Sequence, residues 1–222
     1  MASGRINEIF KSIQGEGLYQ GAVQVFVRFS GCNLNCSFCD TDTGTFNFYD
    51  AGDTLRKIDR LAPYDSVSLT GGEPLLQDDF LREVTGGLKK RSKVVYLETN
   101  GTLPFKLAKV IDCIDVVAMD FKLPSSARLG SFWEEHREFL GIGRRKIVFV
   151  KAVVGENTER ADIEKSIRII RDIDKKIPFI LQLQNPFEDI LRKKAESFAY
   201  FCKAKGLDVR VLSQLHKQLG VK

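Results

Sequence analysis

The chain has 222 residues, of which 43% are hydrophobic and 28% are charged, and its net charge is +5. These proportions are ordinary for a globular protein, and no run approaches the roughly 18 apolar residues of a membrane-spanning helix. The N-terminus lacks the apolar segment of a signal peptide. We therefore expect one cytoplasmic domain over residues 1–222. Basic residues are interleaved with acidic ones, so we expect neither nucleic-acid nor membrane binding.

Short apolar runs alternate with longer amphipathic segments along the chain. The predicted strands are Val23–Phe29, Ser66–Thr70, Val94–Glu98, Val116–Asp120, Ile147–Val153, Phe179–Leu183 and Asp208–Val211. Near-continuous apolar runs of this kind are typical of parallel strands that are covered on both faces. Among the helical segments, one is predicted to follow an N-cap at Thr158, and another to end before Gly206.

Strand–helix alternation predicts an α/β fold with a parallel sheet. A full eight-fold βα barrel needs about 250 residues, so a partial, open, TIM-like βα barrel of about six parallel strands fits this length better. Polar clusters follow several predicted strands, at Thr70–Pro74, Glu98–Gly101, Asp120–Ser126 and Gln182–Asn185. The carboxyl ends of parallel strands meet at one rim, where such barrels carry their chemistry. The site is predicted at that rim.

Cys32, Cys36 and Cys39 form a C-x3-C-x2-C cluster after the first predicted strand. A structural zinc site closes its shell with four ligands, whereas a [4Fe–4S] cluster on three cysteines leaves one iron open. A zinc-binding interaction module stays open as an alternative. Its fourth ligand would come from His136, His216, Asp40 or Asp42. The other two cysteines, Cys113 and Cys202, lie in apolar surroundings and are predicted to be core residues.

The sequence Gly71-Gly72-Glu73-Pro74 ends the second predicted strand. Glycine has no Cβ, so the backbone can approach a ligand closely, and a neighbouring carboxylate suits a ligand ammonium group. Together with the three cysteines, this motif resembles the radical S-adenosylmethionine (SAM) superfamily. The resemblance implies a barrel of the radical SAM type. It also implies that the open iron of a [4Fe–4S] cluster chelates SAM, and that Gly71, Gly72 and Glu73 bind the SAM amino group.

Within that superfamily, the chain is similar to the 7-carboxy-7-deazaguanine synthase family of the queuosine and archaeosine pathways. The similar stretches are Ile6–Gly17, Val25–Cys32, Cys39–Thr41, Leu97–Gly101, Met119–Ser126 and Ser213–Lys217. The similarity implies a lyase that contracts the ring of 6-carboxy-5,6,7,8-tetrahydropterin to 7-carboxy-7-deazaguanine and releases ammonia. A 5′-deoxyadenosyl radical would take the hydrogen at C6 of the pterin, and SAM would be regenerated. The family also requires Mg²⁺.

The same similarity implies residue roles. Thr41 matches a hydroxyl that binds Mg²⁺, and Arg28 is expected to pair with the substrate carboxylate. The expected substrate-binding residues are Ile13, Gln14, Gly15, Glu16, Arg28, Thr99 and His216. Besides the glycine–glutamate motif, the expected SAM-binding residues are Gly101, Ser125 and Gln182, with Ser126 and Gln184 as alternatives to the last two. In the stretch around His216, Leu215 replaces a family threonine. The similarity therefore does not settle which residues form the C-terminal part of the pocket.

The similarity further implies a homodimer that receives electrons from a donor such as flavodoxin or ferredoxin. A second enzyme class, the glycyl-radical activases, shares the three-cysteine spacing. Those enzymes act on a protein partner and consume SAM. They have no use for an Mg²⁺-binding threonine or for pterin-reading residues, and this separates the two hypotheses.

Overall fold

The computed structural model describes residues 2–42 and 44–222, which form one nine-stranded sheet in the order β3-β1-β2-β4-β5-β6-β7-β8-β9. β2 and β4 to β9 run parallel, whereas β1 is antiparallel to both β2 and β3. The strands are β1 (Ser3–Ile13), β2 (Val23–Phe29), β3 (Asn47–Asp50), β4 (Ser66–Gly71), β5 (Val95–Thr99), β6 (Val116–Asp120), β7 (Ile147–Val154), β8 (Phe179–Leu183) and β9 (Val209–Leu212). The open βα barrel is confirmed.

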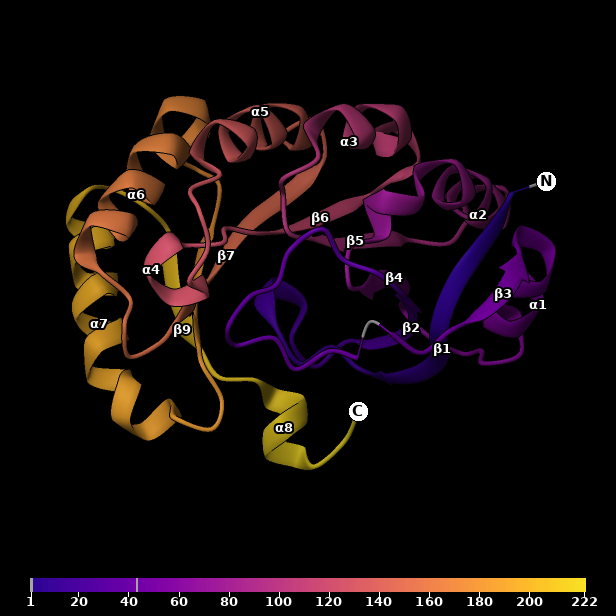
Figure 1. The fold of residues 1–222 in the computed structure, drawn as a ribbon, viewed down its shortest axis with the longest axis horizontal. Helices are drawn as coiled ribbons and strands as arrows, with labels where there is room; N and C mark the ends of the chain where they lie inside the picture. Colours follow the sequence, from indigo (N-terminus) through magenta and orange to yellow (C-terminus); the bar gives the residue numbers. More distant parts are fainter. Residues whose placement is uncertain (1, 43) are drawn as a thin grey trace.

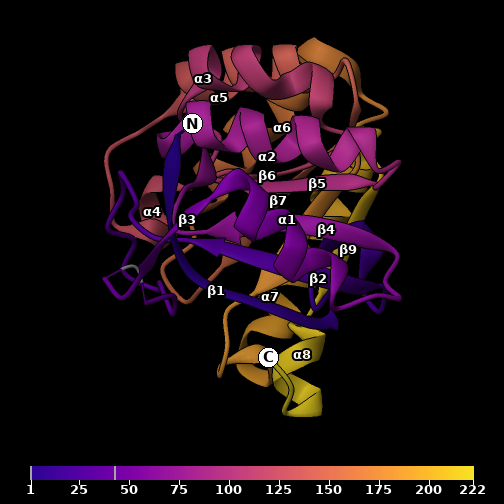
Figure 2. The ribbon, with the colours of Figure 1, turned by 90° about the vertical axis from the view of Figure 1, so that its right-hand side faces the viewer.

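The helices lie mostly on the outer side of the curved sheet (Figure 1). The loop after β2 that carries Cys32, Cys36 and Cys39, the cysteine loop, lies on its inner side. The helices are α1 (Ala51–Asp59), α2 (Asp78–Lys90), α3 (Pro104–Val110), α4 (Pro124–Ala127), α5 (Trp133–Gly143), α6 (Arg160–Asp174), α7 (Glu188–Ala204) and α8 (Leu215–Leu219), with 3-10 turns η1 (Gly17–Tyr19), η2 (Pro74–Gln77) and η3 (Ile111–Cys113). In the turned view, α2, α3, α5 and α6 form a layer over the sheet, and α8 lies apart from them near the C-terminus (Figure 2). No helix of the described residues is long and apolar enough to span a membrane.

Side chains alternate between the two faces of each parallel strand. In β4, Val67 and Leu69 belong to the main core beneath the helices, whereas Ser66 and Ser68 alternate with them and face the inner side. A second, smaller cluster lies on the inner side and includes Tyr96 and Phe149, with Leu18 and Tyr19 of η1 packed against it. These residues fill one end of the barrel. The inner face is therefore buried as predicted, but it mixes apolar with polar groups.

All the predicted strands are present within one residue at either end, but β1 and β3 were missed. β1 has no continuous apolar run, because one side of this antiparallel strand remains partly exposed. β3 is four residues long and forms the edge of the sheet, where Phe48 is 68% exposed. Neither strand carries the buried, β-branched pattern by which a parallel strand is recognised.

The two predicted helix ends have different outcomes. The prediction that Thr158 is an N-cap was wrong, because α6 begins at Arg160 after an N-cap at Glu159. The Thr158 hydroxyl instead accepts the Gly155 backbone N–H at 2.8 Å and closes the preceding turn. Gly206, just beyond α7, has a φ of +83°, and its N–H donates to the Lys203 carbonyl at 2.9 Å. The predicted glycine at this helix end is confirmed.

Candidate active site

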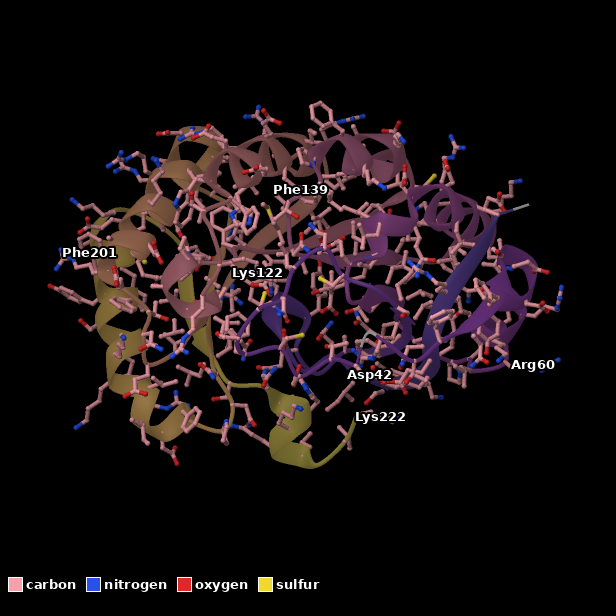
Figure 3. The ribbon with its side chains drawn as sticks, in the orientation of Figure 1. Asp42, Arg60, Lys122, Phe139, Phe201 and Lys222 are labelled. Carbon is pink, nitrogen blue, oxygen red and sulfur yellow. The ribbon has the colours of Figure 1, made fainter. Side chains whose placement is uncertain are left out.

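A cavity of about 530 Å³ lies on the inner side of the sheet. Its walls come from β1 and β2, the carboxyl ends of β4 to β8, the cysteine loop and the C-terminal segment, residues 214–222. The predicted site residues that line it are Ile13, Gln14, Gly15, Glu16, Arg28, Cys32, Cys36, Cys39, Thr41, Gly71, Gly72, Thr99, Gln182 and His216. Glu73, Gly101 and Ser125 are not among the lining residues. Figure 3 shows Lys122 near the centre of the molecule, with Asp42 and Lys222 towards the rim.

The cysteine loop follows β2 directly and is held against neighbouring loops by hydrogen bonds. Ser37 donates from its hydroxyl to the Ser126 carbonyl and from its N–H to the Ala127 carbonyl, both at 3.0 Å. Within the loop, the Cys39 N–H donates to the Cys36 carbonyl at 3.1 Å. This arrangement directs all three thiols toward the cavity from one loop.

The donor set fits an iron–sulfur cluster. Partial burial raises the pKa of the Cys32 and Cys36 thiols, and each of them interacts electrostatically with Cys39, so the three sulfurs lie near one another. Three thiols are the ligand set that leaves one iron of a [4Fe–4S] cluster open. Cys202 is buried in the main core and Cys113 is half-buried at η3, and neither lines the cavity.

Of the four candidates for a fourth zinc ligand, Asp40, Asp42 and His216 line the same cavity as the three cysteines, and His136 does not. Among the described residues, no group of three or more histidine, cysteine or acidic side chains is already arranged to hold a metal ion, so the ligand geometry does not separate zinc from a cluster. His136 is fully buried, stacks on Phe121 with 4.7 Å between ring centroids, and has its Nε2 at 3.2 Å from the Asn100 carbonyl. Burial lowers the pKa of His136 to about 4, so this histidine is neutral and internal.

The glycine–glutamate turn brings the backbone of β4 against that of β2. Gly71 has a φ of +128°, and a Cβ at this position would lie 2.2 Å from the Phe29 carbonyl oxygen. No other residue fits there. The Gly72 N–H donates to the Phe29 carbonyl at 3.0 Å, and the Glu73 N–H donates to the Gly31 carbonyl at 2.9 Å. The turn is therefore fixed directly beside the residue that precedes Cys32.

Glu73 is fully buried beside this turn. Its carboxylate accepts hydrogen bonds from the Thr99 hydroxyl at 2.9 and 3.0 Å, from the Asn100 N–H at 2.8 Å and from the Leu75 N–H at 3.1 Å. No lysine or arginine of the described residues forms a salt bridge with it. Burial raises the pKa of Glu73 to about 7, although these hydrogen bonds and the charge of Lys122 oppose the rise. The site therefore has a carboxylate without a paired cation.

Gln14 and Glu16 enter the cavity from the loop after β1. The Gln14 side-chain amide donates to Gln24 at 3.0 Å and to Glu98 at 2.9 Å, and its oxygen accepts the Glu16 N–H at 3.0 Å. The Ser68 hydroxyl also donates to Glu98, at 2.9 Å. This buried network fixes the conformation of the loop.

Glu16 is paired with Lys151 of β7, and the Gln214 amide donates to its other oxygen at 2.6 Å. Burial alone would raise the pKa of Glu16, but Lys151, Gln214 and His216 lower it to about 2. The pKa of Lys151 is raised, since the nearby carboxylates outweigh its desolvation. Sequence reasoning missed Lys151. A lysine inside the otherwise apolar strand Ile147–Val154 was the available signal.

Asp120 connects Lys151 to a second buried cation. Lys122 lies 2.7 Å from Asp120 and Lys151 lies 3.8 Å from it, and the Lys122 side chain is only 14% exposed. Lys122 Nζ also lies over the ring of Phe38, a residue of the cysteine loop, at 5.4 Å from the ring centroid. Both lysines line the cavity, so a row of alternating charges from Lys122 to Glu16 crosses its floor.

Arg28 projects from β2 into the cavity and pairs with Glu8 of β1 at 3.0 Å. Lys222 also pairs with Glu8, so one carboxylate faces two cations. Its partial burial raises the pKa of Glu8, but the two cations outweigh this effect and lower it. The Arg28 guanidinium also lies over the Phe10 ring at 5.6 Å. It is therefore held in place with cationic charge available to an anionic ligand.

The C-terminal segment covers one side of the cavity. The Leu215 N–H donates to the Gly15 carbonyl at 2.9 Å, and a Cβ on Gly15 would lie 1.8 Å from His216 Nδ1. Lys217 pairs with Asp40 of the cysteine loop at 2.9 Å. His216 is thereby positioned directly against the loop that carries Gln14 and Glu16, even though Leu215 replaces a family threonine.

The remaining predicted residues are placed as follows. Ser125 donates from its N–H and its hydroxyl to Asp162, so it is engaged away from the cavity. Gln182 Oε1 and the neighbouring Ser126 Oγ are buried and have no hydrogen-bond partner among the described residues. Buried polar atoms of this kind need a partner. Gln182 lines the cavity, which favours it as a ligand contact, whereas Ser126 does not line it. Thr41 lines the cavity two residues after Cys39.

A curved, open parallel sheet with a three-cysteine loop after its first parallel strand defines a radical SAM protein. The family model of the radical SAM superfamily matches residues 26–138. A 7-carboxy-7-deazaguanine synthase of Geobacter sulfurreducens is 36% identical over 97% of this chain and 96% of its own length. The one from Methanothermobacter thermautotrophicus is 34% identical over 98% and 97%. The chain therefore belongs to the 7-carboxy-7-deazaguanine synthase family of this superfamily.

Solved structures agree at the level of the fold. The crystal structure of QueE from Escherichia coli superimposes with a TM-score of 0.67, covering 94% of this chain and 93% of its own, at 22% sequence identity. The likeness extends over nearly the whole chain, including the strands on both sides of the cavity.

Proposed function

We propose that this protein contracts the ring of 6-carboxy-5,6,7,8-tetrahydropterin to 7-carboxy-7-deazaguanine and ammonia, with a [4Fe–4S] cluster, SAM and Mg²⁺ as cofactors. One observation carries the proposal: a single cavity of about 530 Å³ joins the three-cysteine loop to the Gln14–Glu16 loop. This volume is typical of sites that bind small molecules. Relatives that match over almost the whole of both chains, and are named 7-carboxy-7-deazaguanine synthases, support the same activity.

Cys32, Cys36 and Cys39 would hold the cluster, which when bound and reduced supplies the electron that cleaves SAM to a 5′-deoxyadenosyl radical. Glu73 is suited to the SAM amino group, because its buried carboxylate lacks a cation and an ammonium group would provide one. Gly71 and Gly72 expose backbone to the ligand, and Gly101 lies behind the same wall. Gln182 contributes an unpaired acceptor. Neither Ser125 nor Ser126 lines the cavity. Ser125 donates its hydrogen bonds to Asp162, whereas Ser126 Oγ has no partner among the described residues, so Ser126 is the better candidate of the two for SAM.

On the opposite wall, Glu16 and Gln14 would read the amino-pyrimidinone edge of the pterin. The low pKa of Glu16 keeps it ionised at neutral pH, so it accepts N–H donors. Arg28 would pair with the substrate carboxylate. Thr99 and Ile13 complete the contacts, and Gly15 and His216 close the wall. Thr41 would offer one oxygen to Mg²⁺, an ion that takes few protein ligands and keeps several waters.

A turnover assay tests this function. The reconstituted protein, reduced under anaerobic conditions, is mixed with Mg²⁺, SAM and 6-carboxytetrahydropterin, and the products are identified by mass. We expect 7-carboxy-7-deazaguanine and ammonia in equal amounts, with SAM conserved. Accumulation of 5′-deoxyadenosine without a deazapurine would contradict the proposal and favour the activase. A colourless protein with bound zinc would favour the zinc-binding module.

We further propose that the chain is a single cytoplasmic domain, that it forms a homodimer and that it takes electrons from a flavodoxin or a ferredoxin. One sheet that joins every described strand supports a single domain. The family similarity supports the dimer and the donor. Light scattering of the purified protein tests the dimer, and a mass of about one chain would contradict it. Reduction of the cluster by each purified donor tests the electron source.

A further inference from the structure

Asn100, directly after β5, uses every one of its hydrogen-bonding groups and is only 5% exposed. Its backbone N–H donates to Glu73 at 2.8 Å, and its carbonyl faces His136 Nε2 at 3.2 Å. Its side-chain oxygen accepts from the Thr102 N–H at 3.0 Å and from the Thr102 hydroxyl at 2.7 Å. Its side-chain nitrogen donates to Asn33 Oδ1 at 2.9 Å and to Cys32 Sγ at 3.9 Å.

The orientation of this amide follows from its neighbours. The Thr102 backbone N–H is always a donor, so the Asn100 atom that faces it must be the oxygen, and the nitrogen must face Cys32. The Asn33 amide donates to the Thr102 hydroxyl at 2.9 Å, which leaves Asn33 Oδ1 facing the Asn100 nitrogen. Asn33, Asn100 and Thr102 thus form a closed ring of hydrogen bonds with one consistent direction. The N–H donor toward Cys32 is fixed by this ring.

The three cysteine sulfurs are not equivalent. Cys32 Sγ also accepts the Leu34 N–H, at 3.4 Å, so two N–H groups point at it. Across residues 2–42 and 44–222, no N–H group donates to Cys36 or Cys39. Hydrogen bonds to the sulfur ligands are one of the factors that set the reduction potential of an iron–sulfur cluster. They favour the reduced state, because reduction adds negative charge that the N–H dipoles stabilise.

We propose that Asn100 is a positioning residue that fixes Cys32 and raises the reduction potential of the cluster. This inference rests on the cluster assigned above to the three cysteines. The backbone of the same residue holds Glu73, so one buried asparagine sets the relative position of the cluster ligand and of the carboxylate expected to receive the SAM amino group.

The test is the midpoint potential of the reconstituted cluster, measured by an EPR-monitored redox titration without SAM or substrate. Asn100→Leu keeps the side-chain volume and removes the donor. We expect its midpoint to be more negative, with an approximately tenfold lower equilibrium constant for reduction, which is about 59 mV for one electron. Asn100→Asp also removes the donor while keeping the shape, and it should shift the midpoint in the same direction.

Ser37→Ala is the matched control. It removes another anchor of the cysteine loop, the hydrogen bond to the Ser126 carbonyl, but no donor to sulfur, and its midpoint should equal that of the unmodified protein. Unchanged midpoints in the Asn100 variants, or an equal shift in Ser37→Ala, would overturn the proposal.

A measurement on the unmodified protein covers the case in which the variants bind no cluster. Protein labelled with ¹⁵N only in the asparagine side-chain amide should show a ¹⁵N coupling to the reduced cluster in pulsed EPR. The Asn100 side chain donates to Cys32 Sγ, so absence of the coupling would overturn the proposal. Neither readout needs turnover. If the unmodified protein is inactive but the Asn100 variants show the expected shift in midpoint potential, only the proposed function is contradicted. If the unmodified protein is active but the Asn100 variants show no such shift, only this inference is contradicted.

Discussion

Two glutamates on opposite sides of the cavity, Glu16 largely buried and Glu73 fully buried, have pKa values shifted in opposite directions. Glu16, on the side formed by β1, β7 and the C-terminal segment, is paired with Lys151, and its pKa is about 2. Glu73, on the side of the cysteine loop, accepts hydrogen bonds but forms no ion pair among the described residues, and its pKa is about 7. Burial raises the pKa of both groups, so the difference comes from the presence or absence of a cation.

The difference separates two kinds of binding group. Glu16 is already neutralised by the protein, so it suits neutral N–H donors of a heterocycle. Glu73 gains a counterion only when a ligand brings one, so it suits the ammonium group of SAM. The same division holds for the loops. Neutral hydrogen bonds involving Asn33, Asn100 and Ser37 anchor the cysteine side, whereas ion pairs such as Lys217–Asp40 hold the C-terminal segment in place.

The largest expected effect tests whether the cysteine side holds the cluster. Cys36→Ala removes one of three sulfur ligands, so the reconstituted protein should lose its visible cluster absorbance and all turnover. Cys113→Ala is the control, because this cysteine is half-buried at η3 and does not line the cavity. It should keep the cluster. Iron and sulfide analysis with absorbance spectra measures both, and a full cluster in Cys36→Ala would contradict the assignment.

The next effect concerns the paired glutamate. Lys151→Met leaves the Glu16 carboxylate buried without a cation, and breaking a buried ion pair in this way costs about 3–5 kcal/mol. We expect a lower free energy of unfolding in urea at pH 7, together with a raised pKa of Glu16. The double variant Lys151→Met/Glu16→Gln removes both charges and should recover part of the loss. A single variant as stable as the unmodified protein would mean that the pair contributes nothing.

The unpaired glutamate predicts a pH-dependent affinity for SAM. In the proposed role, the SAM ammonium group would bind the ionised form of Glu73, whose pKa is about 7, so the affinity should rise with pH. The ionised fraction grows about tenfold between pH 6 and pH 8, and the dissociation constant should fall by the same factor. Calorimetry on the reconstituted protein measures it. Glu73→Gln should bind more weakly at pH 8 and show no such dependence; an equally steep profile in that variant would assign the titration to another group.

The raised pKa of Glu73 also affects the stability of the ligand-free protein. Because the folded-state value lies above the ordinary value of 4.5, its contribution is fully present below pH 4.5 and is lost as the pH rises through about 7. Glu16 behaves in the opposite way. Its contribution is present above pH 4.5 and is lost as the pH falls toward about 2. Urea unfolding of Glu73→Gln and Glu16→Gln across this range separates the two contributions.

The smallest effect concerns the C-terminal segment. Lys217 and Asp40 are 39% and 58% exposed, and exposed pairs contribute about 0.2–1 kcal/mol. Lys217→Ala should therefore raise the KM for the pterin only a few-fold, and less at high salt, where screening already weakens the pair. Lys203→Ala, at the end of α7, is the control and should change nothing. Equal KM values for Lys217→Ala and the unmodified protein at low salt would show that this pair does not close the cavity.

Much of the fold was predictable because the information is local. The parallel strands carry β-branched runs that bury both faces, and Gly71 stands where only a residue without a Cβ fits. The missed elements lack such local signals. β1 is a half-exposed antiparallel strand. Thr158 closes the turn before α6 and does not cap that helix. The tertiary environment sets the exposure of β1, whereas the local hydrogen bond from Gly155 engages Thr158.

Sequence alone determined the chemistry of the cluster side, because cysteine spacing and a glycine–glutamate turn act through neighbours within a few residues. Only the tertiary structure decided which charges are neutralised. Lys151 meets Glu16 across 135 residues, and Gly15 meets His216 at the far end of the chain. Such pairs depend on sheet register and on how the C-terminal segment packs. A carboxylate's pKa in a buried cavity therefore follows from the fold, since it is the fold that supplies or withholds the cation.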